Sequence, residues 1–231
     1  MVVAAVVVAA ADAPAVGRVV MVAGATGLVG RAVLAVLLAD KRYRAVHTLG
    51  RRAAHPPHPR LTHHAVADLA RLPALPAVDD VFIALGTTIK LAGSQAAFRA
   101  VDHDAVLAIA RAAYKAGATR LAVVSSMGAD PASRVFYSRV KGETEAALQT
   151  IGYATQVIAR PSMLAGDRVA LAQAPRLGEQ VGLALMNLLK PLIPRNYRPI
   201  QAAQVAQAMV QAMAADQGGI QILLSGQMQP A

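Results

Sequence analysis

Three glycines at a fixed spacing constrain the fold of this chain more than any other feature of its sequence. Gly24, Gly27 and Gly30 stand in the segment VVMVAGATGLVGRAV, directly after a β-branched run and directly before a run with helical apolar spacing. The first glycine permits a sharp turn, the second lets the backbone approach phosphates at the helix N-terminus, and the third lets the helix pack closely on the strand. This strand–loop–helix context predicts a dinucleotide-binding loop rather than an ordinary turn.

Alternating Val-rich and Ala/Leu-rich blocks extend this unit along the chain. Apolar residues make up 55% of the 231 residues and aromatic residues only 3%, so Ala, Val, Leu and Ile must build the core. Strands are predicted over 18–23, 44–49, 61–66, 81–85, 120–125, 153–159 and 220–224, and helices over 28–39, 95–116 (N-capped by Ser94), 134–150, 176–189 and 200–214. This pattern predicts an α/β fold: a doubly wound, mostly parallel Rossmann sheet with helices on both faces.

Two segments are predicted to lie outside the sheet: the N-terminal residues 1–16 and a small C-terminal cap. Residues 1–16 form an Ala/Val-rich extension that is disordered or frayed; no basic region precedes the apolar run, as a secretory signal would require. Residues 17–231 form a single domain, with a small C-terminal cap drawn from about 161–200. Within the cap, the apolar run 181–193 is too short to span a membrane. It is expected to pack in the core or at a subunit interface, which is compatible with a homodimer, and the alternative is that it lines a substrate pocket.

Composition narrows the classes of function. The chain has no cysteine, which excludes disulfides, thiolate metal sites and cysteine nucleophiles, and which fits a reducing cytoplasm. The net charge of +10 comes from scattered Lys and Arg side chains, so we expect a solvated basic surface and no nucleic-acid partner. His55, His58, His63 and His64 have no nearby carboxylate partner, and alternating strand positions point to opposite faces, so no metal site is expected.

The end of the second strand indicates which dinucleotide binds. NAD-binding proteins place an Asp or Glu there to bond the ribose hydroxyls, whereas this chain has LGRRAA. Arg51 and Arg52 are suited to pair with a 2′-phosphate, so NADP(H) is favoured over NAD(H). Asp68–Leu69 stands after the third strand, where adenine contacts are commonly made, and Leu85–Gly86–Thr87 stands at the carboxyl edge of the sheet, where ligands bind.

A serine, a tyrosine and a lysine form the candidate catalytic group. Tyr137 and Lys141 are spaced i, i+4, so both point from one helical face. A nearby ammonium favours the phenolate, and a tyrosine can then exchange a proton with a carbonyl or an alcohol. The fifth strand ends in Ser125–Ser126, where a hydroxyl can hold the same substrate oxygen, while the nicotinamide carries the hydride.

Together these motifs resemble a known family. The chain is similar to atypical short-chain dehydrogenases/reductases, in particular to the Tat-interacting tumour-suppressor protein group and its bacterial oxidoreductase relatives. The resemblance covers roughly residues 18–215. It rests on GATGLVG (24–30), LGRR (49–52), LGTTIKLAGS (85–94), FRAVDHDAVLAIA (98–110), VVSSMGAD (123–130), FYSRVKGETE (136–145) and ARPSMLAGDR (159–168).

The resemblance implies a Rossmann fold, NADP(H) binding and a Ser–Tyr–Lys site, with Ser126 as the site serine and Ser125 as the alternative. It implies cofactor contacts from Gly24, Thr26, Gly27, Leu28, Val29, Gly30, Arg51, Arg52, Asp68, Leu69, Leu85, Gly86, Thr87, Tyr137, Lys141 and Pro161. The chain also departs from the main branch of the family. The Asn-Ala-Gly segment after the fourth strand is replaced by Leu85–Gly86–Thr87, and the helical asparagine of the proton relay is not evident, although Asp102 lies nearby.

The sequence therefore predicts a cytoplasmic, NADP(H)-dependent oxidoreductase that acts on a small carbonyl or alcohol, with no membrane partner. The alternative is an NADP(H)-sensing regulatory or protein-binding module with little or no turnover. A third possibility is an epimerase or dehydratase that recycles its cofactor. It is not favoured, because such enzymes usually have a larger substrate domain than this sequence provides.

Overall fold

The structure is a computed structural model that describes residues 17–53, 57–69, 71–165 and 194–230. The predicted N-terminal extension, the helix over 176–189, the apolar run 181–193, His55 and most of the predicted cap lie outside the described residues. Within the described ranges, no helix combines the length and the apolar character that a membrane crossing demands.

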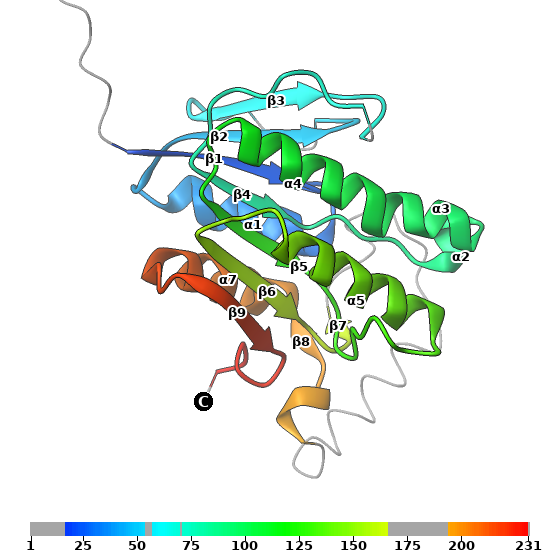
Figure 1. The fold of residues 1–231 in the computed structure, drawn as a ribbon. Coiled ribbons are helices and arrows are strands. Elements are labelled where there is room, and N and C mark those ends of the chain that lie inside the picture. Colours follow the sequence, from blue (N-terminus) through cyan, green and yellow to red (C-terminus); the bar gives the residue numbers. More distant parts are fainter. Residues whose placement is uncertain (1–16, 54–56, 70, 166–193, 231) are drawn as a thin grey trace, which may run out of the picture.

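A single parallel sheet of seven strands organises the molecule (Figure 1). The strand order is β3-β2-β1-β4-β5-β6-β9, so the direction of winding reverses between β1 and β4, where ligands bind in open α/β sheets. The strands are β1 (Arg18–Ala23), β2 (Tyr43–Gly50), β3 (Leu61–Ala65), β4 (Asp80–Ile83), β5 (Arg120–Val124), β6 (Thr155–Arg160) and β9 (Gly219–Leu224). The predicted doubly wound Rossmann sheet is confirmed, with every strand end within two residues of its predicted position.

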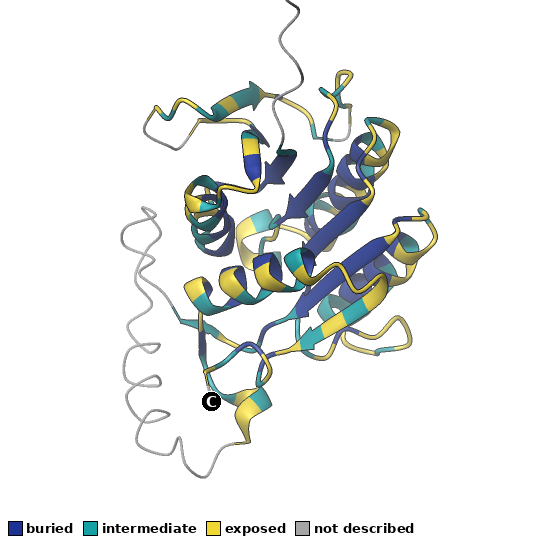
Figure 2. Cartoon of the chain, turned by 90° about the vertical axis from the view of Figure 1, so that its left-hand side faces the viewer, coloured by how far each residue is buried: buried dark blue, intermediate teal, exposed yellow. Residues whose placement is uncertain are grey.

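Helices cover both faces of this sheet. Helices α1 (Leu28–Ala39) and α7 (Ala202–Ala215) pack on one face, and α4 (Val106–Lys115) and α5 (Phe136–Gln149) pack on the other (Figure 1). Strand β1 alternates between the two cores: Val20 and Val22 join the α1/α7 side, whereas Met21 joins the α4/α5 side. The central strands are consequently buried on both faces (Figure 2), as their continuous apolar runs predict.

The region predicted as one helix over 95–116 is divided into three parts. Helix α3 (Gln95–Arg99) begins at Ser94, whose hydroxyl accepts from the Ala97 N–H at 3.0 Å as predicted, and a π-helical turn (Ala100–Ala105) separates it from α4. A further short helix, α2 (Ile89–Ala92), and a two-stranded sheet of β7 (Leu164–Ala165) with β8 (Ile200–Gln201) were not predicted. Elements this short leave no measurable periodicity in a sequence.

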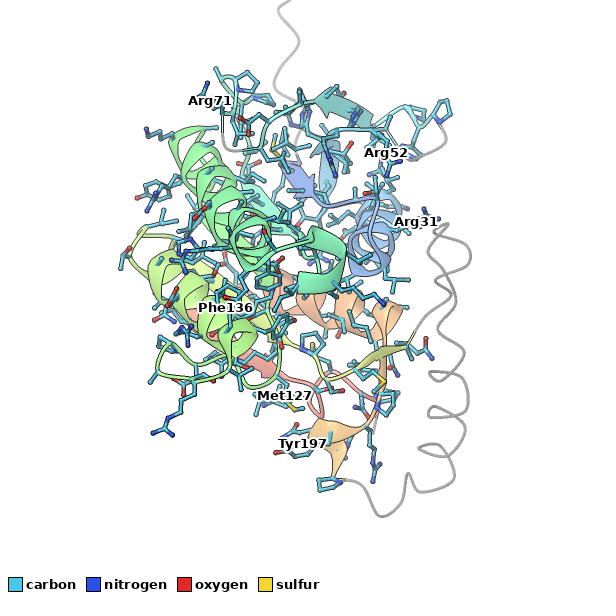
Figure 3. The ribbon with its side chains drawn as sticks, turned by 90° about the vertical axis from the view of Figure 1, so that its right-hand side faces the viewer. Arg31, Arg52, Arg71, Met127, Phe136 and Tyr197 are labelled. Atoms are coloured by element: carbon cyan, nitrogen blue, oxygen red, sulfur yellow. The ribbon has the colours of Figure 1, made fainter. Side chains whose placement is uncertain are left out.

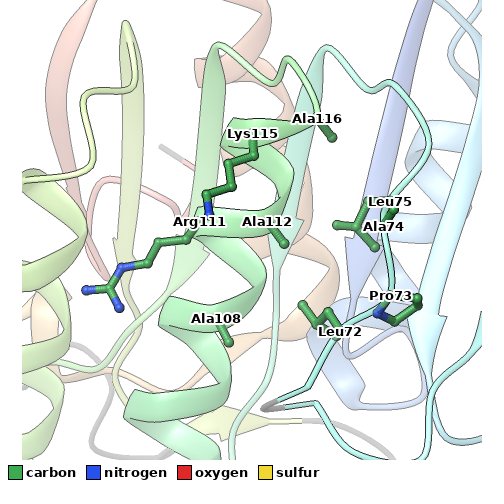
Figure 4. Close-up of a pocket in the computed structure, with 9 residues that line it drawn as sticks. All are labelled: Leu72, Pro73, Ala74, Leu75, Ala108, Arg111, Ala112, Lys115 and Ala116. Carbon is green, nitrogen blue, oxygen red and sulfur yellow. The ribbon is translucent and has the colours of Figure 1, made fainter.

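The connection from β3 to β4 is a loop, and it leaves a groove of about 450 Å³ against α4. Leu72, Pro73 and Leu75 line one wall, and Ala108 and Ala112 line the other (Figure 4). Because the Val78 N–H donates to the Ala116 carbonyl, this groove lies toward the amino ends of the strands, away from the carboxyl edge.

A buried carboxylate joins the amino ends of four strands, β1, β2, β4 and β5. The Asp80 side chain is fully buried and accepts from Arg18 at 2.7 Å, from Arg120 at 2.6 Å and from the Tyr43 hydroxyl at 2.8 Å. Burial acts to raise the pKa of Asp80, but the hydrogen bonds from Arg120 and Arg18 together lower it below its usual value. Burial also raises the pKa of Tyr43, which keeps this hydroxyl a donor.

Candidate active site

The glycine loop fills the space between β1, β4 and α1. Gly24 has φ +85°, and a Cβ on it would lie 2.5 Å from the Ala84 carbonyl oxygen. A Cβ on Gly30 would lie 2.1 Å from the carbonyl oxygen of Gly24. Since neither position has room for a side chain, both glycines are required by close backbone packing, as the sequence motif predicts.

Gly27 differs from its two neighbours in the motif. Its φ is −81°, and a Cβ there would come no closer than 3.4 Å to another heavy atom, the Gly24 carbonyl oxygen. Gly27 is the N-cap of α1 and has no side chain to cap the helix, so the first N–H groups of the helix lack intrahelical partners. Val29 faces the core, and Thr26 is exposed at the tip of the loop. Backbone amides at the N-terminus of a twelve-residue helix thus fit the pyrophosphate of a dinucleotide.

Three exposed arginines follow the glycine loop and strand β2. Arg51 and Arg52 follow β2 directly and are exposed. Arg31, in the first turn of α1, is also exposed, and Figure 3 shows it on the same side of the molecule as Arg52. Arg31 was missed in the sequence, although its position next to Gly30 was a usable signal. Beyond β3, Leu69 packs partly against the α4/α5 core, next to Asp68.

The loop after β4 is tied to the helix that follows it. Leu85 packs partly against the core, and a Cβ on Gly86 would lie 3.7 Å from an Asp102 carboxylate oxygen. The Thr87 N–H donates to Asp102 Oδ2 at 2.9 Å. The loop predicted to contact the cofactor is therefore fixed by a side chain that the sequence analysis had noted without a role.

The two candidate serines have different surroundings. Ser125 is buried, and its hydroxyl donates to Glu145, which also accepts from Arg160 at 2.5 Å. Ser126 is half-buried, and its hydroxyl donates to the Met127 carbonyl at 3.0 Å. Pro161 lies beside them, because its carbonyl accepts from the Met127 N–H at 3.0 Å. Ser125 is thus engaged in an internal network, whereas Ser126 keeps an accessible side.

Tyr137 and Lys141 lie on one side of α5, at the same carboxyl edge. The Tyr137 ring is half-buried, with its centroid 5.4 Å from that of Phe98. Lys141 Nζ lies 2.7 Å from Asp102 Oδ1, and the two side chains are 6% and 0% exposed. Among the described residues, Asp102 is thus the charged partner of the lysine.

Gly142 allows α5 to approach the loop after β5. A Cβ at this position would lie 2.2 Å from the backbone of both Asp130 and Pro131. This contact brings the helix that carries Tyr137 and Lys141 against the segment that follows Ser126. The sequence analysis did not single out Gly142, because a lone glycine in a helix gives no signal of a close approach.

Two of the histidines, His47 and His64, form a pair across neighbouring strands. His47 Nδ1 and His64 Nε2 are 2.8 Å apart on neighbouring strands, and burial is the main cause that lowers the pKa of both rings. His63 Nδ1 bonds the Thr48 hydroxyl at 3.0 Å, on the other side of the sheet. The part of the chain that the structure describes holds no group of three or more His, Asp or Glu side chains arranged for a metal ion.

Comparison with protein families agrees with the glycine loop. A family model described as NAD(P)H-binding matches residues 24–216. The chain is 37% identical over 154 residues to "Protein fmp52, mitochondrial" of Emericella nidulans. The aligned region covers 63% of this chain and 66% of that protein, so the chain spans just under two thirds of this relative's length. It is 33% identical over 206 residues to "Protein FMP52, mitochondrial" of Coccidioides immitis, with 83% of each chain covered.

Solved structures show the same fold at low sequence identity. A short chain dehydrogenase family protein from Francisella tularensis has a TM-score of 0.66 and 16% identity, covering 91% of this chain and 98% of that one. A UDP-N-acetylglucosamine 4-epimerase from Methanobrevibacter ruminantium has a TM-score of 0.65 and 16% identity, covering 90% and 76%. These neighbours support the Rossmann-like α/β fold.

The comparisons also correct one expectation. The sequence analysis assigned the chain to the cytoplasm, partly because it lacks cysteine. The curated relatives carry names that place them in mitochondria. The cytoplasmic assignment was therefore wrong. The error arose because the lack of cysteine does not distinguish between these two compartments.

Proposed function

The chain belongs to the NAD(P)H-binding family of Rossmann-fold proteins related to short-chain dehydrogenases/reductases, and on that premise we propose that it is an NADP(H)-dependent oxidoreductase. Its substrate is a small carbonyl compound or the corresponding alcohol. One observation carries the proposal: Ser126, Tyr137 and Lys141 stand at the ends of β5 and the start of α5, at the same sheet edge as the glycine loop.

The choice of NADP(H) rests on charge. Arg51 and Arg52 are exposed directly after β2, Arg31 is exposed in the first turn of α1, and β2 is followed by no Asp or Glu until Asp68. Arginine forks match phosphate oxygens, so this group favours a ribose that carries a 2′-phosphate. An acid at this place, which would favour the free hydroxyls of NAD(H), is missing from the sequence.

Each residue of the catalytic group has a separate role in this proposal. Tyr137 exchanges a proton with the substrate oxygen, and Lys141 supports the ionised phenol. Ser126 holds the same oxygen, since Ser125 is already bonded to Glu145. The bound nicotinamide supplies or accepts the hydride.

The second candidate function is an NADP(H)-sensing module with little turnover. The observation in its favour is the buried ion pair of Lys141 with Asp102, in which a carboxylate 2.7 Å away offsets the lysine charge. A lysine that is neutralised in this way supports the phenolate less than a free ammonium would.

Cofactor titration tests the first half of the proposal. We expect wild type to bind NADPH more tightly than NADH, and the double variant R51A/R52A to lose about ten- to hundredfold in NADPH affinity, since bonds to charged groups contribute about 1.5–3 kcal/mol. NADH affinity should stay unchanged, as should both affinities in R111A, which alters an exposed arginine on α4. Tighter binding of NADH by wild type would contradict the assignment.

A panel of aldehydes and ketones with NADPH tests the second half. Turnover should fall by about a hundredfold or more in Y137F, because general acid–base groups contribute about 10²–10⁴-fold. The control Y114F removes a hydroxyl from an exposed tyrosine of α4 and should keep wild-type turnover. Turnover that survives in Y137F would refute the mechanism, and NADPH binding without turnover across the panel would favour the sensing module.

A further inference from the structure

Asp102 reaches the active site because the helix is locally widened. It lies in the π-helical turn Ala100–Ala105, and π-helical turns inside α-helices are frequent at functional sites. Its side chain is fully buried, while the next acid along the chain, Asp104, is 54% exposed. The Thr144 hydroxyl of α5 lies 3.1 Å from the Asp102 carbonyl oxygen and 2.7 Å from the Val140 carbonyl oxygen, so this turn packs directly against the helix of Tyr137 and Lys141.

The two carboxylate oxygens of Asp102 serve two different elements. Oδ2 accepts from the Thr87 N–H at 2.9 Å, and Oδ1 lies 2.7 Å from Lys141 Nζ. We propose that Asp102 is a positioning residue that holds Lys141 and the loop after β4 as one unit, so that the lysine and the cofactor-contacting loop take their places together. This inference rests on the proposed function, because it presupposes that Tyr137 and Lys141 are the reacting pair.

The geometry requires a carboxylate at this position. Both partners of Asp102 are donors, and an ammonium and a backbone N–H have no acceptor to offer. An asparagine has one acceptor oxygen, so its amide nitrogen would face a donor on one side or the other.

No other described acid is free to replace Asp102. Glu145, one turn beyond Lys141 on α5, accepts from Arg160 at 2.5 Å and from Ser125. Glu143 pairs with Arg99 on the outer side of the helix. Removing the Asp102 charge therefore leaves Lys141 buried without a counter-charge, so its amine is no longer held in an ion pair.

Competitive acetylation of lysines in the cofactor-free protein tests the pair. In wild type, Lys141 should react at least about tenfold more slowly than exposed Lys115, because a buried, paired ammonium is a poor nucleophile. In D102N its rate should rise about tenfold, while D104N, which alters the exposed neighbouring acid, should leave it unchanged. Lys141 that reacts as fast as Lys115 in wild type, or at equal rates in folded D102N and D104N, would overturn the proposal.

Amide hydrogen exchange at Thr87 tests the coupling without relying on D102N to fold. In K141M the Asp102 carboxylate loses the partner that holds its Oδ1, so the side chain is held less firmly in place as the acceptor for the Thr87 N–H. Exchange at Thr87 should therefore quicken severalfold, although Lys141 does not bond Thr87. Unchanged exchange in K141M would show that the lysine and the loop are independent, contrary to the proposal.

NADPH affinity separates a positioning role from a purely structural one. We expect folded D102N to bind NADPH about tenfold more weakly than D104N, in line with the loss of one hydrogen bond to a charged group. Equal affinity in the two variants would overturn the proposal. Failure of wild type to bind NADPH would instead refute the proposed function, while the acetylation and exchange results, taken without cofactor, would stand.

Discussion

The two ends of the sheet each bury a carboxylate, but they use it differently. At the amino end, Asp80 accepts from two arginines and a tyrosine, and Arg120 also donates to the Met213 carbonyl of α7. At the carboxyl end, Asp102 has one lysine and one backbone amide. A lysine ammonium has three donors, so Lys141 retains donors beyond the one that faces Asp102. The donors around Asp80, in contrast, are used within that network. The comparison indicates that the amino end stabilises the fold and the carboxyl end keeps groups available for a ligand.

The largest expected effect comes from breaking the amino-end network. D80N leaves Arg120, whose side chain is 8% exposed, without its main counter-charge, and should lower the free energy of unfolding by about 3–5 kcal/mol. Urea denaturation at pH 7 measures this loss, with D104N as the control for removal of an exposed acid. Folded D80N should still bind NADPH with wild-type affinity. If D80N and D104N were equally stable, the network would not have the structural role assigned to it.

Acid provides a second measurement of the same network. The folded-state pKa of Asp80 is lowered, so its contribution is fully present above about pH 4, where the unfolded carboxyl is ionised, and is lost as the pH falls through the lower folded value. Wild type should therefore lose stability more steeply below pH 4 than D80N does. Parallel curves for the two proteins would contradict this sign.

Alanine at two positions of the glycine loop should separate packing from binding. In G30A the added Cβ meets the Gly24 carbonyl oxygen, so the protein should lose about 1–3 kcal/mol of stability despite the roughly 1 kcal/mol gain in helix propensity. In G27A the Cβ has room, so stability should change by less than about 1 kcal/mol. NADPH affinity should nonetheless fall about tenfold in G27A, because the methyl group stands where the backbone approaches phosphate. Thermal unfolding and NADPH titration of both variants check this, and a stable G30A would refute the packing argument.

The smallest expected effect concerns His47 and His64. Burial lowers the pKa of both rings, so the unfolded chain binds protons first as the pH falls below about 6.5, and stability declines in that range. The loss should be about 0.5 kcal/mol or less, because both rings are partly exposed and water screens their charges. H64Q should flatten the dependence of Tm on pH between 5.5 and 7.5. An unaltered slope would mean that other groups cause it.

Sequence patterns within single elements predicted the fold and the glycine loop. Contacts between elements that are distant in sequence were not predicted. Helix α1 was predicted over 28–39, the range observed, because its ends follow from apolar spacing and Gly27. The ties among Thr87, Asp102 and Lys141 could not be predicted, since they join three elements through a π-helical turn that resembles ordinary helix in sequence. The need for glycine at position 142 could not be predicted for a similar reason, because its close contact is with a loop that precedes its own helix.

The packing of α1 against α7 also has a consequence for how the chain is made. Val33 and Leu37 of α1 share a core with Val205 and Met209 of α7, yet α1 ends at Ala39 and α7 begins at Ala202. At about 5–20 residues per second, a ribosome releases α7 roughly 10–30 s after α1. During that interval the nascent chain displays an apolar helix face whose partner has not been synthesised. The apolar face of α1 therefore stays without its native partner until α7 has been synthesised.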